Sequence, residues 1–223
     1  MDNLRIAFIG TGSMGSAVLD GLLAAGHPKA LISATTRTEA KAKALRDRGI
    51  SALAGETSPD ANALMAGDAD LIVLGVKPYQ IVDVLTELKG EIGKNAVVIS
   101  MAAGIQLTTM AAVLDENPNI IRTMPNTPAL VGKGVTGLAA AGSASQAAVD
   151  AAKALFEAVG SVLVIPETQI DALSAVSGSG PAWVYYIIEQ WEKVAVSEGF
   201  SEEDAKLLVR QTLAGSLELL EST

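Results

Sequence analysis

The 223-residue chain has 25 acidic and 16 basic side chains and a formal net charge of -9, which argues against a nucleic-acid partner because neutralising phosphates needs a basic surface. It contains no cysteine and a single histidine, His27, which disfavours a disulfide, a thiol nucleophile, a Ser-His-Asp triad and a zinc or other metal site. The length suits a nucleotide-binding domain with a smaller second domain, and the chemistry must come mainly from a cofactor.

The beginning of the chain has the pattern of a buried strand, a glycine turn and a helix. A mostly apolar run over 5–9 precedes the turn, and apolar residues predominate over 17–23. The turn itself consists of Gly10, Thr11, Gly12, Ser13, Met14 and Gly15. In such a motif the first glycine makes the turn, the second lets a pyrophosphate approach the backbone, and the third packs helix against strand. Glycines also serve as ordinary turn residues, but this order predicts a dinucleotide site whose phosphates bind at the helix start.

The end of the second expected strand indicates which dinucleotide binds. A strand over 31–35 leads into Thr36, Arg37 and Thr38, with no acidic residue at its end. An NAD site places an acid there for the ribose 2′-hydroxyl, whereas an NADP site places Arg and hydroxyl groups for the additional phosphate. We therefore favour NADP (NADPH), with NAD possible. The alternative is that Arg37 is a solvated loop charge and Thr38 only caps a helix that begins at Glu39.

Further strands are expected over 71–75, 97–99, 120–122, 135–140 and 162–165, separated by helical patterns near 39–48, 81–88 and 146–159. This alternation predicts a doubly wound α/β domain. Ligands of such sheets lie beyond the carboxyl ends of the strands, so three loops can face one cofactor. The loops are Val76-Lys77-Pro78, Ala102-Ala103-Gly104 and Pro125-Asn126. Each loop taken alone could be an ordinary turn.

After Pro166 the strand pattern ends and helical patterns dominate, over about 170–176, 183–194 and 201–220. We therefore divide the chain into a dinucleotide-binding domain, 1–165, and an all-α domain, 166–223. Ser201 followed by three acidic residues predicts a capped helix start. The helices carry more apolar positions than one packed face needs, which indicates a homo-oligomer interface, although any single position could belong to a core.

The sequence shows no sign of export or membrane insertion. Its start lacks a basic segment followed by an apolar signal core, and no apolar stretch is long enough and free of polar residues to span a bilayer. Together with the lack of cysteine, these features predict a cytoplasmic protein without a membrane or nucleic-acid partner.

Five segments together resemble the pyrroline-5-carboxylate reductases, in that family's order. They are 9–15, 76–78, 100–104, Arg122-Thr-Met-Pro-Asn-Thr-Pro128 and Asp171-Ala-Leu-Ser-Ala-Val-Ser-Gly-Ser-Gly-Pro-Ala182, of which the last two are the most specific. The resemblance covers essentially the whole chain. It implies a Rossmann-like domain followed by a helical dimerisation domain, and the reduction of Δ1-pyrroline-5-carboxylate to L-proline with NADPH or NADH, the final step of proline biosynthesis.

The resemblance also implies a role for each loop. The glycine loop and 36–38 would bind the adenosine end, 77–78 and 102–104 the middle, and Pro125 with Asn126 would lie near the nicotinamide. Ser177, Ser179 and Pro181 would border the substrate, a small cyclic imine. No residue is assigned as a proton donor and no metal is implied. A protonated imine accepts hydride readily, so the protein mainly needs to align the reacting carbons.

One departure from the family pattern concerns the end of the chain. The family continues with a helical hairpin and a signature resembling Thr-Ser-Pro-Gly-Gly-Thr-Thr, whose hydroxyls and amides touch the substrate. This sequence ends at 221–223, where that segment should begin. We expect a missing tail rather than a naturally short, impaired protein, because 201–220 preserves the helix that packs with it. Two alternatives are a related NADP-dependent reductase acting on another imine or a deazaflavin, which should lack the block 177–182, and a non-catalytic NADP-binding protein.

Overall fold

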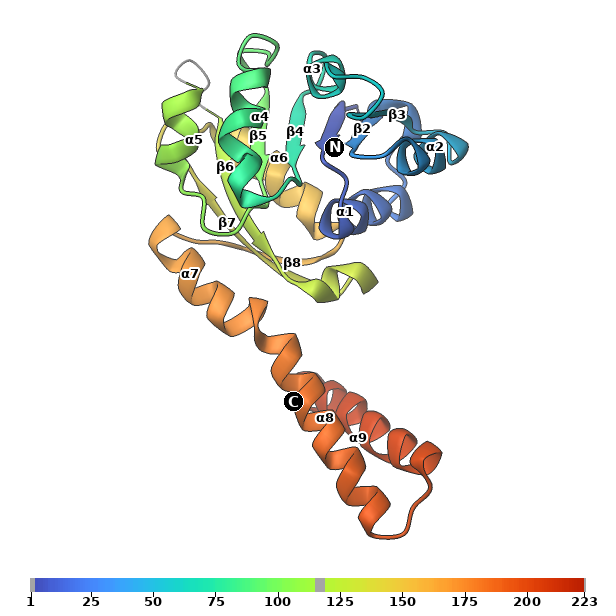
Figure 1. Ribbon diagram of the computed structural model, residues 1–223. Helices are drawn as coiled ribbons and strands as arrows, with labels where there is room; N and C mark the ends of the chain where they lie inside the picture. The colour runs from blue at the N-terminus through green and yellow to red at the C-terminus, as the bar shows by residue number, and fades with distance from the viewer. Residues whose placement is uncertain (1–2, 115–118, 223) are drawn as a thin grey trace. The chain divides into compact units, whose positions relative to one another are not determined.

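An eight-stranded sheet forms the centre of the first part of the chain, in the computed structural model, which describes residues 3–114 and 119–222 (Figure 1). Its strand order is β3-β2-β1-β4-β5-β6-β7-β8, and β1 to β6 pair in parallel. β7 runs antiparallel to β6 and parallel to β8. The strands are β1 (Ile6–Ile9), β2 (Ile32–Thr36), β3 (Ser51–Ala54), β4 (Leu71–Leu74), β5 (Val97–Ser100), β6 (Ile120–Pro125), β7 (Gly134–Ala140) and β8 (Gly160–Val164). The predicted doubly wound α/β class is confirmed.

Helices cover both faces of the sheet, which is why the strands read as continuous apolar runs. α1, α2 and α6 pack on the face that carries Ile6 and Phe8, and α3, α4 and α5 pack on the face that carries Ala7 and Ile9 (Figure 1). The helices are α1 (Ser13–Ala24), α2 (Glu39–Asp47), α3 (Ala61–Ala66), α4 (Ile81–Leu88), α5 (Leu107–Val113) and α6 (Gln146–Glu157). Alternate residues of one strand therefore supply two separate cores.

Short helical turns connect several of these elements. Four are 3₁₀ turns: η1 (Lys29–Leu31), η2 (Pro78–Gln80), η3 (Thr127–Val131) and η4 (Glu167–Gln169). A one-turn helix, α7 (Ile170–Leu173), follows, and it continues into a π-helical turn, η5 (Ser174–Gly178). The sequence pattern predicted one regular helix over 170–176; the structure instead widens its second half into the π turn.

The chain forms two compact units, Met1–Gly178 and Ser179–Thr223. The segment 167–178 belongs to the first unit because Ile170 is buried in the same core as α4 and α5, and because Leu173 lies against Gly137 of β7. The second unit is the helical hairpin of α8 (Gly180–Ser197) and α9 (Glu202–Ser222). Ser201 caps α9, its Oγ accepting from the Asp204 amide at 3.1 Å, as the sequence pattern predicted.

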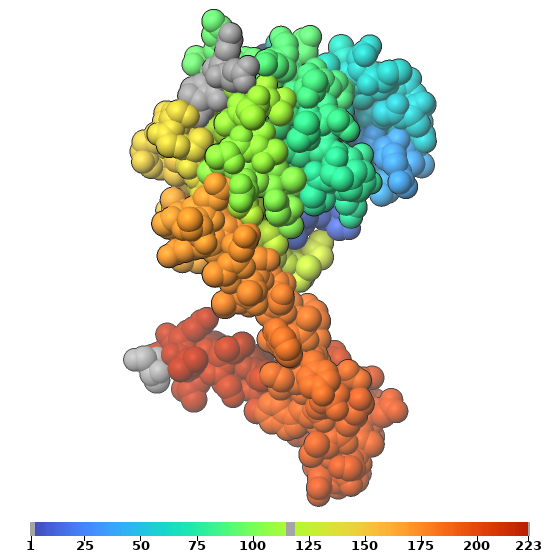
Figure 2. Space-filling view, turned by 60° about the vertical axis from the view of Figure 1, so that its left-hand side comes forward, coloured from blue at the N-terminus to red at the C-terminus, as the bar shows by residue number. Residues whose placement is uncertain are grey.

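The two helices of the second unit leave most of their apolar side chains uncovered. Within the unit, only Ala205 and Val209 of the described residues are buried, whereas both tryptophans and two tyrosines of α8 are exposed. This hairpin is coloured orange to red in Figure 2. Two helices cannot enclose so many large side chains, and exposed apolar surface of this kind marks an interaction site. Among the described residues, no helix has both the length and the apolar character needed to cross a membrane.

Candidate active site

The glycine turn after β1 is held against the neighbouring strands. Gly10 has a φ of +80°, and a Cβ added to it would lie 2.5 Å from Val76 Cγ1. Its amide donates to Thr35 Oγ1 at 2.9 Å, while the Thr11 amide donates to the Thr35 carbonyl at 2.8 Å. Gly12 then caps α1 without a side chain, and a Cβ added there would meet its nearest neighbour, the Gly75 carbonyl oxygen, at 3.9 Å. The first amides of α1 are thus open to an anion, because a helix leaves its first four N–H groups without helical acceptors.

A cavity of about 300 Å³ lies between this turn and α2. Its lining combines the backbone and hydroxyl groups of the turn with side chains of α2: Thr11, Gly12, Ser13, Ser16, Thr36, Lys41, Ala44, Leu45 and Arg48. Arg37 is exposed just after β2 and does not line this cavity. Arg48 forms an ion pair with Asp20. The sequence pattern did not indicate Lys41, which lies on α2; the fold places it beside the glycine turn.

The carboxylate of Glu56 lies at the start of α2. The sequence pattern for NAD or NADP considers only the end of β2, whereas Glu56 follows β3. The Glu56 carboxylate, in the loop after β3, accepts from the Glu39 amide, and the Glu56 amide donates to the Arg37 carbonyl at 3.3 Å. The Thr36 hydroxyl donates to the Thr38 carbonyl at 2.9 Å. The loop 36–38 is therefore tied both to itself and to the loop after β3.

The loops after β4 and β5 adjoin the glycine turn at the same edge of the sheet. The Gly75 amide donates to the Ile9 carbonyl at 2.8 Å, and a Cβ added to Gly75 would lie 2.5 Å from the Gly10 carbonyl oxygen. Lys77 and Pro78 are exposed, whereas Ala102 is buried and its amide donates to Ser100 Oγ at 3.2 Å. Ala103 and Gly104 are exposed, and Gly104 has a φ of +75°. The parallel pairing of β1, β4 and β5 thus brings three predicted site segments to one edge.

Asn126, which directly follows β6, is joined to Ser177 of the same unit. Its Nδ2 donates to the Ser177 carbonyl at 2.9 Å and its Oδ1 accepts from the Val135 amide at 2.8 Å. Ser179 and Pro181 belong to the second unit, where Ser179 is the cap of α8 and Pro181 lies in its first turn. The structure therefore brings Asn126 and Ser177 together within one unit.

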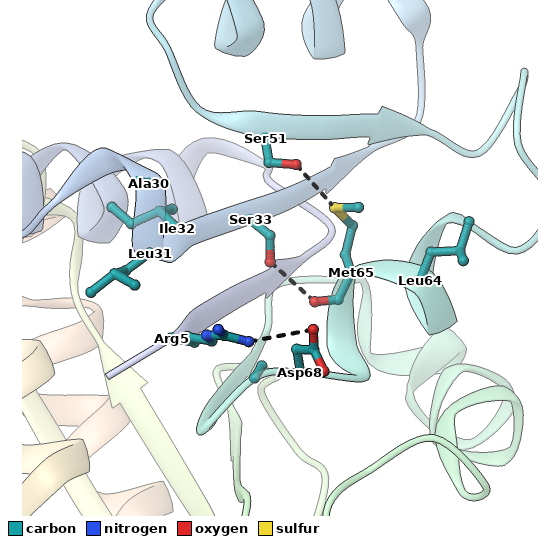
Figure 3. Close-up of a pocket in the computed structure, with 10 residues that line it drawn as sticks. Arg5, Ala30, Leu31, Ile32, Ser33, Ser51, Leu64, Met65 and Asp68 are labelled. Atoms are coloured by element: carbon teal, nitrogen blue, oxygen red, sulfur yellow. Dashed lines mark hydrogen bonds and ion pairs between the residues drawn. The ribbon is translucent and has the colours of Figure 1, made fainter. Parts of the chain in front are cut away.

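A second cavity, of about 280 Å³, lies at the opposite edge of the sheet (Figure 3). Arg5, Ser33 and Ser51 line it at the amino ends of β1, β2 and β3, and Arg5 pairs with Asp68 at 3.4 Å. Ligands of doubly wound sheets bind at the carboxyl edge, so this cavity lies away from the candidate site. In the described part of the chain, no group of three or more His, Cys, Asp or Glu side chains could hold a metal ion.

Two family models match the chain. Residues 5–104 match the model described as NADP oxidoreductase, coenzyme F420-dependent, and residues 167–223 match the model described as pyrroline-5-carboxylate reductase dimerisation. The sheet order, the glycine turn and these matches define an oxidoreductase with a Rossmann-type domain and a helical dimerisation domain.

Relatives identify the family within this class. The pyrroline-5-carboxylate reductase of Methanosarcina acetivorans is 37% identical over 221 residues, which cover 98% of this chain and 80% of the relative. That of Vibrio alginolyticus is 38% identical over 224 residues, which cover 100% of this chain and 80% of the relative. The chain belongs to the pyrroline-5-carboxylate reductase family.

Solved structures agree with this assignment. A pyrroline-5-carboxylate reductase from Coxiella burnetii is 34% identical with a TM-score of 0.91, over 99% of this chain and 80% of that one. The Plasmodium falciparum enzyme, solved with NADP bound, is 29% identical with a TM-score of 0.86, over 100% of this chain and 80% of that one. The resemblance drawn from sequence motifs is thereby confirmed.

Proposed function

We propose that this chain reduces Δ1-pyrroline-5-carboxylate to L-proline with NADPH, by hydride transfer to the carbon of a cyclic C=N bond. The observation that carries this proposal is the 37% identity with the M. acetivorans reductase over 98% of this chain, a span that takes in both the glycine turn and the block 171–182. A deazaflavin-dependent or other imine reductase would not be expected to share that block. A shared block also disfavours a purely NADP-binding role.

The residues at the carboxyl edge of the sheet fit a dinucleotide. Gly10 makes the turn against Val76, Gly12 leaves open the space that a side chain would occupy, and the first amides of α1 supply donors for a pyrophosphate. We propose that the cofactor contacts are Gly10, Thr11, Gly12, Ser13, Met14, Gly15, Thr36, Arg37, Thr38, Val76, Lys77, Pro78, Ala102, Ala103, Gly104 and Pro125. Asn126 would lie beside the nicotinamide without a side-chain bond to it, because its amide is bonded to Ser177 and Val135. When bound there, NADPH supplies the hydride.

The rest of the reaction depends on how the chain holds the imine. We propose that Ser177, Ser179 and Pro181 border the substrate, and that hydroxyls and backbone amides hold its carboxylate. A ring nitrogen that carries a proton makes its carbon electrophilic, so orientation is the main contribution required of the protein, and orientation can supply several kcal/mol. No histidine is needed: His27 lies after α1 with Nε2 3.1 Å from the Leu4 carbonyl.

The domain and partner assignments are part of the same proposal. Residues 1–165 would form the dinucleotide-binding domain and 166–223 the oligomerisation and substrate domain, acting in the cytoplasm. The exposed aromatic side chains of α8 support a homo-oligomer through the C-terminal helices. A monomeric mass for the complete protein, measured by light scattering, would contradict that interface.

The direct test is an NADPH oxidation assay on the complete protein with Δ1-pyrroline-5-carboxylate, with proline identified by chromatography. The expected result is stoichiometric conversion of the imine to proline. Parallel reactions with another small cyclic imine and with a deazaflavin address the alternatives. Turnover of one of those substrates, without turnover of pyrroline-5-carboxylate, would overturn the proposal.

Arg37→Ala is expected to weaken NADPH binding about 10- to 100-fold and NADH binding less than about twofold, because only NADPH carries the phosphate that the guanidinium would bind, and bonds to charged groups contribute about 1.5–3 kcal/mol. Fluorescence titration with both nucleotides measures the two affinities. Arg5→Ala is the control, since Arg5 lies at the opposite edge of the sheet (Figure 3).

If Arg37 does not bind the additional phosphate of NADPH, a second variant tests another cationic side chain for that role. Lys41 lines the cavity beside the glycine turn, so Lys41→Ala tests it as the competing phosphate contact. A NADPH-selective loss in Lys41→Ala, with equal losses of both nucleotides in Arg37→Ala, would transfer the role to Lys41.

A further inference from the structure

Both polar atoms of the Asn126 side-chain amide form hydrogen bonds within the protein. It is 8% exposed. Its Nδ2 donates to the Ser177 carbonyl, 51 residues away along the chain, at 2.9 Å, while its Oδ1 accepts from the Val135 amide at 2.8 Å. The amide therefore bridges the first residues of β7 and the π turn. An amide held in this way has one donor hydrogen left for any other contact.

The carbonyl that Asn126 binds belongs to the π turn. A π turn shifts the backbone hydrogen bonds from the fourth to the fifth residue along the helix, and such turns occur frequently at functional sites. Ser177 lies within the π turn, and its own hydroxyl donates back to the Leu173 carbonyl at 3.0 Å. A Cβ added to Gly178 would lie 3.1 Å from Ser174 Oγ of the same turn and 3.7 Å from Met124 Cε, so the turn is close-packed within itself and contacts the Met124 side chain of β6.

A second side chain of β6 holds the same segment at its other end. Arg122 is buried, and its Nη1 and Nη2 donate to Glu167 Oε1 at 3.1 Å and to Asp171 Oδ1 at 3.0 Å. Glu167 Oε1 also accepts from the Leu107 amide at 2.7 Å. Arg122 thus holds η4 and α7, and Asn126, which follows β6, holds the far end of the segment at Ser177.

We infer that Asn126 is a positioning residue for the substrate: its Nδ2 fixes the Ser177 carbonyl and thereby the π turn that carries the substrate border. This inference rests on the proposed function. It makes the side chain act on the imine through Ser177 rather than on the nicotinamide. Affinity for the imine should then depend on the amide, and affinity for NADPH should not.

Asn126→Asp is the test, because the change keeps an oxygen for the Val135 amide and replaces the Nδ2 donor with a carboxylate oxygen that can only accept. We expect the KM for pyrroline-5-carboxylate to rise about tenfold or more, with the NADPH dissociation constant within about twofold of the unmodified protein. Asn126→Ala removes the donor without burying a charge and is expected to give the same pattern. Asn126→Ala replaces Asn126→Asp as the test if the aspartate variant does not fold.

Asn119→Asp is the matched control. Asn119 is 7% exposed at the other end of β6, where its Oδ1 accepts from the Ser145 amide at 3.1 Å. The same isosteric change there should leave both the KM for the imine and the NADPH affinity within about twofold. It controls for the general cost of placing a carboxylate beside β6.

Hydrogen–deuterium exchange over 174–178 gives a readout that does not need activity. Faster exchange in the Asn126 variants than in Asn119→Asp supports the inference. Equal exchange, an unchanged KM, or an NADPH dissociation constant that rises as much as the KM would overturn it. Absence of imine reduction by the unmodified complete protein would instead overturn the proposed function, and the exchange comparison would still decide the role of Asn126.

Discussion

Gly12→Ala is expected to weaken NADPH binding about 100-fold, or about 2.8 kcal/mol, while lowering the free energy of unfolding by about 1 kcal/mol or less. The backbone of Gly12 has φ -83° and ψ -164°, which alanine adopts readily, and the added Cβ would meet only the Gly75 carbonyl oxygen, at 3.9 Å. The folded chain thus accommodates the methyl group. A bound pyrophosphate leaves no space for this methyl group, because the second glycine of the motif is where the backbone approaches the phosphates.

Alanine variants of two other glycines serve as comparisons for Gly12→Ala, because they separate the effect on NADPH binding from the effect on stability. Gly10→Ala places a Cβ 2.5 Å from Val76 Cγ1 on a backbone with φ +80°, so this variant should lose stability as well as NADPH binding. Gly26 has a φ of +89° with no atom within 4 Å of an added Cβ, so Gly26→Ala should cost stability alone. Fluorescence titration with NADPH and urea unfolding measure the two quantities. NADPH binding by Gly12→Ala at the affinity of the unmodified protein would contradict the proposed pyrophosphate site.

Arg122→Met is expected to lower the free energy of unfolding by about 1.5–3 kcal/mol, because the variant loses the hydrogen bonds of a buried guanidinium to charged groups. The Arg122 side chain is 5% exposed and lies between Glu167, which is 26% exposed, and Asp171, which is 86% exposed. Without the guanidinium, Glu167 retains the Leu107 amide as a donor, and Asp171 is hydrated. The loss therefore comes mainly from Glu167, and η4 and α7 should loosen from β6.

Arg46→Met is the matched control for this prediction. Arg46 pairs with Glu39 on α2 at 39% and 43% exposure, and its Nη1 donates to the Ala52 carbonyl at 3.0 Å, so its loss should cost about 1 kcal/mol. Urea unfolding followed by circular dichroism compares the variants, because both tryptophans lie in α8 and their fluorescence reports on the helical hairpin. Equal stability of Arg122→Met and Arg46→Met would contradict a central role for Arg122.

Local sequence patterns were sufficient for most of the first unit. The apolar runs at β1, β4 and β5 are continuous because each strand is covered on both faces, and the glycine turn is recognisable because backbone geometry at Gly10 excludes a side chain. The strand β3 was missed, since the short sequence Ser-Ala-Leu-Ala has little β preference and is held as a strand by pairing with β2.

The sequence by itself determined the alternation of strands and helices, the position of the glycine turn and the capped start of α9, all of which depend on neighbouring residues. Tertiary structure alone decided that Asn126 binds Ser177, that Arg122 pairs with Glu167, and that Lys41 faces the glycine turn. These contacts join residues about 30 to 50 positions apart. Their energies arise from burial and hydrogen-bond geometry, which residue spacing along one element does not encode.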